Sequence, residues 1–149
     1  MDGVLRWFTR SAKLTRGAAD LALRRHGVRV GQNLVLELLW ERDGLTPGAV
    51  AERLHVTTPT VVKMANRMEA AGLVTRRRDA ADSRLVRLHL TERGRAVQLA
   101  VERELAMLEE RATAGLSEDE RRCLLAALAT IVHNLEGEVP PEEEPDQPI

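Results

Sequence analysis

With 149 residues and a net charge of −1, the chain is long enough to bury one ordinary core and is expected to fold as a single domain. Aromatic residues make up only 2% of the sequence, so the core has to be built from aliphatic side chains, which favours a mainly α-helical class. The single cysteine excludes an internal disulfide; we expect no membrane span and no secretory leader, and the cytoplasm is the expected compartment.

Charge is strongly segregated along the chain although the total is near zero. Residues 1–29 carry seven Lys or Arg against two acids and residues 45–100 carry ten against five, so each segment has a net charge of +5. Residues 101–149 carry four against thirteen, a net of −9. Because attraction to phosphate depends on local charge, this pattern suits a protein that holds DNA through one face. A solvated charged surface is the alternative interpretation.

The first predicted element is a helix over residues 4–26, because apolar residues recur at three- and four-residue steps until Gly27. Residues 30–41 are apolar nearly all round, as in a short helix buried in the middle of a domain. The turn pair Asp43 and Gly44 ends this second helix.

Two short helices separated by a tight turn are predicted next. Thr46, followed by a proline, caps a helix that reaches residue 54. Thr57 or Thr58, again followed by a first-turn proline, caps a second helix that runs to Gly72. This pair is a candidate helix-turn-helix.

The second helix of this pair has two different faces. One face is expected to anchor the helix to the core through Val61, Met64, Met68 and Ala71. The outward face combines hydroxyl, ammonium, amide, guanidinium and methyl groups, which suit base edges and phosphates. The predicted DNA contacts are Thr57, Thr58, Thr60, Val62, Lys63, Asn66 and Arg67. For this helix alone, a solvated surface explains the pattern equally well.

After Gly72 the pattern alternates, which predicts a β-hairpin with strands over residues 73–78 and 84–90 and a polar tip between them. In the second strand, Val86, Leu88 and Leu90 are expected on the packed face. A hairpin directly after a recognition helix is a wing, and its arginines suit the minor groove of DNA. The predicted wing contacts are Arg76, Arg77, Arg78, Asp82, Ser83 and Arg84, with Arg87 in the same cluster.

Asp82 stands two residues before Arg84 at the predicted tip. We expect this carboxylate to hold the Arg84 guanidinium in one direction through a bidentate pair. An exposed ion pair of negligible energetic value is the alternative.

Two long helices are predicted after the wing. Thr91 caps the first, which continues to Gly115 with an apolar stripe. Ser117 and Glu120 form a capping box for the second. Its apolar positions are Leu124, Leu125, Leu128, Ile131, Val132 and Leu135. The Pro- and Glu-rich segment 138–149 is expected to be disordered.

The stretch from Gly44 to Gly94 resembles the MarR-type regulators, the multiple-antibiotic-resistance repressor family. The matching motifs are the end of the helix-turn-helix at residues 67–74, the wing motif Asp82-Ser83-Arg84, and Leu90-Thr91-Glu92-Arg93-Gly94. The resemblance implies a mainly α fold with a small β-hairpin wing, a winged helix-turn-helix. It also implies one domain over residues 1–137, with a DNA-binding lobe at 30–90 and dimerisation helices at 1–29 and 91–137.

The function implied by the resemblance is transcriptional regulation by a homodimer on a pseudo-palindromic double-stranded DNA operator, with half-sites about one helical turn apart. Family members are often repressors released by a small anionic or aromatic effector bound between the dimer helices and the DNA-binding lobe. Trp7, Arg10 and Trp40 would lie near that region, although buried tryptophans are more often plain core.

Three other possibilities stay open: constitutive DNA binding, redox response, and a winged helix that binds protein. Cys123 is expected to be a buried, inert cysteine of the last helix. The four histidines are too far apart in sequence for a zinc site, and no cofactor is expected. The sequence carries no glycine-rich phosphate loop and no nucleophile elbow, so an enzyme is not expected.

Overall fold

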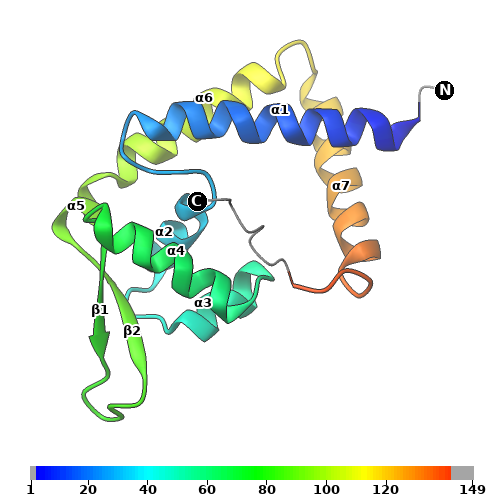
Figure 1. The fold of residues 1–149 in the computed structure, drawn as a ribbon. Coiled ribbons are helices and arrows are strands. Elements are labelled where there is room, and N and C mark those ends of the chain that lie inside the picture. Colours follow the sequence, from blue (N-terminus) through cyan, green and yellow to red (C-terminus); the bar gives the residue numbers. More distant parts are fainter. Residues whose placement is uncertain (1–2, 142–149) are drawn as a thin grey trace, which may run out of the picture.

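A computed structural model describes residues 3–141 of the chain. It consists, within those residues, of α1 (Val4–Arg24), α2 (Gln32–Glu41), α3 (Pro47–Leu54), α4 (Thr58–Ala70), β1 (Val74–Arg78), β2 (Val86–Leu90), α5 (Glu92–Ala96), α6 (Gln98–Ala112) and α7 (Glu118–Leu135). Figure 1 shows α2, α3, α4 and the hairpin gathered in one lobe, with α1 lying along α6 above it. The mainly α-helical class with a small hairpin is confirmed.

The core of the lobe lies between α2, α3, α4 and the hairpin. Its buried aliphatic side chains come from α2, α3, α4 and the start of the wing, and include Val35, Leu36, Leu39, Val50, Val61, Ala65, Met68, Leu73 and Leu88. Each fully buried side chain of this kind contributes about 1.5–3 kcal/mol relative to its exposed state. The inner face of α4 is therefore held firmly, and the direction of its outer face is set by this packing.

The inner face of α4 includes one buried residue that the prediction left out. Val61 and Met68 are buried as expected, whereas Met64 and Ala71 are only partly buried. Ala65, which the prediction left out, is 1% exposed. A small side chain at this point lets α4 approach the lobe closely.

The hairpin is antiparallel, with Val74 opposite Leu90 at its base and Arg78 opposite Val86 near its tip. The backbone N–H of Leu88 donates to the carbonyl oxygen of Leu45 at 2.8 Å, so the segment after α2 forms a short third edge. Leu88 and Leu90 are buried as predicted, but Val86 is 37% exposed. The prediction for Val86 is wrong because this part of β2 extends beyond the lobe.

The predicted helix caps are confirmed. Thr91 Oγ1 accepts a hydrogen bond from the N–H of Gly94 at 3.0 Å. Ser117 and Glu120 form the full capping box, with N–H to side-chain distances of 2.7 and 3.1 Å. The helix predicted to run unbroken from Thr91 is instead divided into α5 and α6 at Val97.

Helices α1 and α6 connect the lobe to the rest of the chain. His26 Nε2 lies 2.9 Å from Glu104 Oε1, and Leu23 of α1 and Val101 of α6 are both fully buried in the core. In Figure 1, α7 crosses near the N-terminal end of α1, away from the lobe.

Helix α7 has no buried residue in the described chain. Cys123 on this helix is exposed, so the expectation that it is buried is wrong. The large exposed apolar residues of α7 are Leu124, Leu125, Leu128, Val132 and Leu135. A row of this kind leaves the helix without an apolar partner inside the chain.

The segment 138–149 lies mostly outside the described residues. Only residues 138–141 are described, and the N–H groups of Glu138 and Val139 both donate to the carbonyl oxygen of Leu135. Across residues 3–141, no helix combines the length and the apolar character needed to cross a membrane.

Candidate nucleic-acid interface

The turn between α3 and α4 depends on a residue in the left-handed backbone region. His55 has φ 55° and ψ 47°. The N–H of Val56 donates to the carbonyl oxygen of Ala51 and that of His55 to Glu52, which is a Schellman ending. Thr57 then caps α4 by accepting from the N–H of Thr60 at 3.3 Å. The short turn and the caps together set the angle at which α4 leaves α3.

The outer face of α4 carries most of the residues predicted to contact DNA. Their five exposed members are Thr58, Val62, Lys63, Asn66 and Arg67. Thr57 is half-buried because its hydroxyl caps the helix. The structure thus gathers amide, ammonium, guanidinium and methyl groups on one accessible helix.

Thr60 does not belong to this exposed face. It is 7% exposed, and its hydroxyl lies 2.8 Å from that of Thr57. The prediction that Thr60 points outward is therefore wrong. The reason is local, because Thr60 occupies the third position of α4 and its hydroxyl therefore contacts that of the capping residue Thr57.

The wing tip is organised around Asp79. Its Oδ1 accepts hydrogen bonds from the N–H groups of Ala81 at 2.8 Å and Asp82 at 3.0 Å, and its Oδ2 accepts from Arg87 Nε. The Arg87 guanidinium and then the two backbone N–H groups lower the pKa of the Asp79 carboxyl to about 2. An ionised Asp79 therefore shapes the loop that presents the tip arginines.

Arg84 is a highly exposed cation of the wing, with a side chain that is 90% exposed. Its Nε and its backbone N–H both donate to Asp82 Oδ1, at 3.2 and 3.1 Å. The predicted bidentate pair is therefore wrong, because one carboxylate oxygen takes both bonds. The contact still turns Asp82 toward Arg84 and leaves the two terminal guanidinium nitrogens outside the pair.

The other wing arginines have different partners. Arg76 donates to Glu69 from its backbone N–H at 3.0 Å and from its guanidinium at 3.2 Å. These two bonds lower the pKa of the Glu69 carboxyl and tie the base of the wing to α4. Arg78 donates to the carbonyl oxygen of Ser83 at 3.4 Å, whereas Arg77 is exposed on β1 opposite Arg87.

Sequence reasoning missed the residues that support the wing from behind. Arg87 Nη1 donates to the carbonyl oxygen of Gly44 at 2.9 Å. Asp43 accepts from the N–H of Leu90 and from Arg95 Nη2, both at 2.9 Å. From the sequence, Asp43 and Gly44 are predicted only as a turn. An aspartate beside a turn glycine, with arginines in the strand and helix that follow, is the pattern that could have indicated their contacts with the wing.

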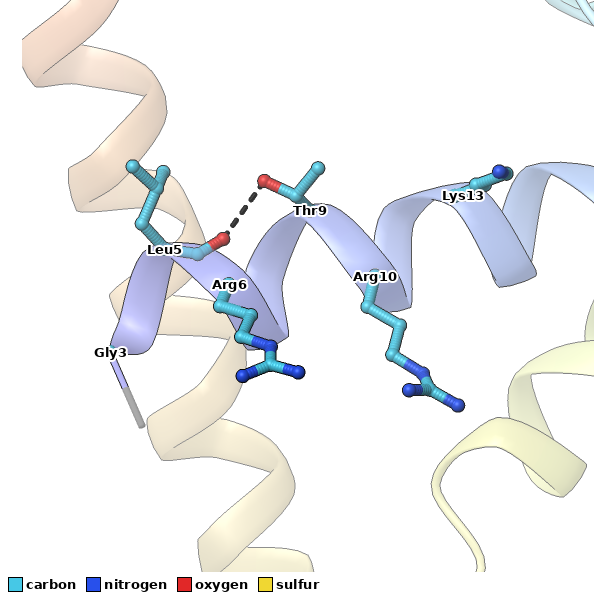
Figure 2. A pocket seen from close by; sticks show the side chains of 6 residues that line it. All are labelled: Gly3, Leu5, Arg6, Thr9, Arg10 and Lys13. Atoms are coloured by element: carbon cyan, nitrogen blue, oxygen red, sulfur yellow. Dashed lines mark hydrogen bonds between the residues drawn. The ribbon is translucent and has the colours of Figure 1, made fainter. Parts of the chain in front are cut away.

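The structure separates the three residues predicted for an effector pocket. Trp40 is half-buried, and its Nε1 donates to the carbonyl oxygen of Gly94 at 2.8 Å. Trp7 is 63% exposed on α1. Arg10 lines a shallow groove on α1 together with Arg6 and Lys13, and neither tryptophan is part of its lining. Figure 2 shows Arg6 and Arg10 projecting from the same side of α1.

No group of three or more His, Cys, Asp or Glu side chains within residues 3–141 is arranged to hold a metal ion.

An exposed helix of a helix-turn-helix, followed directly by an arginine-rich hairpin, defines a winged helix-turn-helix protein. The model of the MarR family matches residues 30–86 of the chain. The chain is 35% identical over 109 residues to the HTH-type transcriptional regulator TtmR of Methylorubrum extorquens (strain PA1). The matched region covers 73% of this chain and 55% of TtmR, so this chain spans little more than half the length of that relative.

The organic hydroperoxide resistance transcriptional regulator of Bacillus subtilis (strain 168) is also 35% identical, over 113 residues that cover 70% of this chain and 69% of the relative. Among solved structures, the transcriptional repressor CouR bound to a 23-mer DNA duplex has a TM-score of 0.80 and 29% identity, and the match covers 88% of this chain and 93% of CouR. The chain belongs to the MarR family.

Proposed function

We propose that the chain is a sequence-specific regulator of transcription, acting as a repressor, that binds double-stranded DNA in the cytoplasm as a homodimer. The observation that carries the proposal is the pairing of an exposed polar face on α4 with the exposed Arg84 of the wing. The bonds from Arg76 to Glu69 hold the two elements together. Relatives named as transcriptional regulators, and a similar repressor bound to a DNA duplex, support it.

Each recognition helix α4 would enter a major groove. Lys63 and Arg67 suit guanine edges or phosphates, Asn66 suits adenine, and Val62 suits the methyl group of thymine. Arg84 would enter the adjacent minor groove, where narrow A·T segments concentrate negative potential. The other wing contacts proposed are Arg77, Arg78 and Ser83, while Arg76 and Asp82 act by positioning.

The dimer would form through α1, α6 and α7, that is, through residues 1–29 and 91–137 outside the lobe at 30–90. Apolar residues exposed on these helices include Leu5 and Trp7 at 77% and 63%, Leu99 at 66% and Leu125 at 70%. An apolar surface of this extent marks an interface. A second copy of the same chain would cover it and place two α4 helices on successive half-sites.

Release by a small molecule is the regulatory part of the proposal. Arg6, Arg10 and Lys13 give the groove on α1 three cations, which suits an anionic effector. Trp7 lies on the same helix, while Trp40 would take part only through the packing of the core. The measurement is DNA affinity with and without aromatic carboxylates, comparing the natural chain with Arg10→Ala.

Fluorescence anisotropy with a labelled duplex from the region upstream of the gene tests DNA binding. Each neutralised phosphate contributes about −0.9 to the slope of log affinity against log salt. Contacts by Lys63, Arg67 and Arg84 in two protomers therefore predict a slope of about −5. Lys63→Ala should flatten the slope while the dimer stays intact by size-exclusion chromatography. A slope near zero, or equal affinity for an unrelated duplex, would contradict the proposal.

A further inference from the structure

A basic groove lies between α1 and the recognition helix α4 and shares Arg67 with the interface with DNA described above. Four cations line it: Lys13 and Arg16 of α1, Arg29 before α2, and Arg67 of α4. Apolar side chains between them include Leu54 and Val56, which flank His55 in the turn of the helix-turn-helix. With a volume of about 720 Å³, the groove is large enough to hold a short peptide segment.

The positive charge of the groove is only partly balanced by the residues that line it. Within residues 3–141, Asp20 is the single carboxylate that lines it, and it accepts from Arg29 at 2.9 and 3.2 Å and from the N–H of Val30 at 3.0 Å. These bonds, that from Arg29 first, lower the pKa of Asp20, so this carboxylate is ionised and already engaged. Between residues 3 and 141, neither Lys13 nor Arg16 forms an ion pair. The groove therefore favours an anionic occupant.

The chain beyond α7 arrives at the rim of this groove. His55 Nε2 lies 3.1 Å from the carbonyl oxygen of Val139, a contact between residues 84 positions apart in sequence. His55 is flanked by Leu54 and Val56, both of which line the groove. The backbone at Val139 thus lies next to the apolar side of the groove.

The sequence after Val139 suits the groove in length and charge. Two prolines follow, and they favour an extended backbone of about 3.1 Å per residue. Glu142 lies three positions after Val139, so the acidic run begins within roughly 10 Å of the contact at His55. The run contains Glu142, Glu143, Glu144 and Asp146, four carboxylates in five residues.

We infer that the acidic segment 142–146 docks in this groove of its own chain and faces Lys13, Arg16 and Arg67. Arg67 also belongs to the outer part of α4 that is proposed to contact DNA. The docked segment therefore competes with DNA phosphate for the same guanidinium and acts as an intramolecular brake on DNA binding. The docking itself does not depend on the proposed function, whereas the brake rests on it.

Zero-length cross-linking of the full chain tests the docking without DNA. A carbodiimide joins a carboxylate to a primary amine that touches it, and the chain has only two lysines, Lys13 in the groove and Lys63 outside it. We expect the acidic peptide to be linked to Lys13, with the link lost in 1 M salt, where charges are screened within about 3 Å. Absence of the Lys13 link, or linkage to Lys63 alone, would overturn the docking.

Lys13→Arg serves as the control, since it keeps the charge but removes the reactive amine. Mixing isotope-labelled with unlabelled protein identifies which chain supplies the segment. Products of uniform label are expected from docking within one chain. Products that join a labelled to an unlabelled peptide, in the proportion that random mixing of the chains gives, would overturn the assignment to the same chain.

DNA affinity tests the brake. The variant E142Q/E143Q/E144Q is compared with E102Q/E109Q/E110Q, which removes three exposed glutamates from α6 and changes the net charge equally. Size-exclusion chromatography establishes first that both variants have the oligomeric state of the natural chain. At about 50 mM salt, we expect the first variant to bind at least threefold more tightly than the second. Equal affinities would overturn the brake. Failure of all the proteins to bind DNA would instead overturn the proposed function, and the cross-linking result would stand separately.

Discussion

Arg87 binds Asp79 within the wing, and the same guanidinium donates from Nη1 to the carbonyl oxygen of Gly44 at 2.9 Å. One side chain therefore joins the tip loop, β2 and the turn after α2. Charge-assisted bonds of this kind are stronger than neutral ones. The direction of the wing therefore depends on the pair of Arg87 with Asp79. This pair supports the tip loop that carries the exposed contact of Arg84 with Asp82.

The pH dependence of the wing should follow the ionisation of Asp79. The pKa of this carboxyl is lowered from 3.8 to about 2, so its stabilising contribution is complete above about pH 4 and is lost as the pH falls through about 2. Carbon-13 NMR of the Asp79 carboxyl should show a midpoint well below 3.8. A midpoint at or above that value would contradict the role given to Arg87.

Asp79→Asn gives the matching test at neutral pH. The amide keeps an acceptor for the N–H groups of Ala81 and Asp82 but loses the charge that holds Arg87. Hydrogen exchange of these two amides should become faster while the core amides of α4 stay protected. Unchanged exchange at the tip would show that Asp79 does not organise the loop.

Arg84→Ala should weaken operator binding at least tenfold, which corresponds to about 1.4 kcal/mol. The cause is the loss of an exposed wing cation, and the fold should not change because this side chain is 90% exposed. Gel-shift titration measures the effect. Arg103→Ala on α6 removes the same charge from an exposed site and should leave affinity within twofold. Equal affinities for the two variants would rule out the wing contact.

Leu125→Glu should convert the dimer into monomers and abolish tight operator binding. Leu125 is 70% exposed on α7 and would be covered by the second copy, where a carboxylate cannot be desolvated without a large cost. Sedimentation velocity reports the oligomeric state. Leu85→Glu, at a wing position that is 41% exposed, should leave the dimer intact. A dimeric Leu125 variant would place the interface elsewhere.

Gly94→Ala should destabilise the fold strongly. A Cβ at this position would lie 2.1 Å from the carbonyl oxygen of Leu73, so α5 would have to move away from the start of the wing. Urea unfolding should show a loss of at least about 2 kcal/mol, as for other core clashes. Gly48→Ala, where a Cβ meets nothing within 4 Å, should leave the stability unchanged or raise it. Similar unfolding midpoints would contradict this close packing.

The local features of this chain could be predicted from its sequence. Caps at Thr91 and Ser117, the hairpin and the exposed side of α4 all follow from patterns within a few residues, and the structure bears them out. The prediction that Thr60 faces outward fails because its hydroxyl pairs with that of Thr57, a local contact that helical spacing alone does not predict. The break between α5 and α6 at Val97 contains no glycine or proline, so the sequence pattern does not predict it.

Contacts between distant parts of the chain could not be predicted. The bond from Trp40 to Gly94 joins residues 54 positions apart, and that from Arg87 to Gly44 joins residues 43 apart. Spacing within one element holds no information about such pairs, since they depend on how elements pack. For the same reason, the sequence predicts Trp40 as a residue of the effector pocket, whereas its indole packs against the core.

Footprinting of the DNA upstream of the gene tests the central claim most directly, with the natural chain and with the double variant Lys63→Ala/Arg84→Ala. A homodimeric winged helix should protect two half-sites whose centres are about 10–10.5 base pairs apart or a multiple of that spacing. The double variant should lose both protected half-sites together while remaining dimeric. No discrete protected region with the natural chain, or an unchanged footprint with the double variant, would contradict the account.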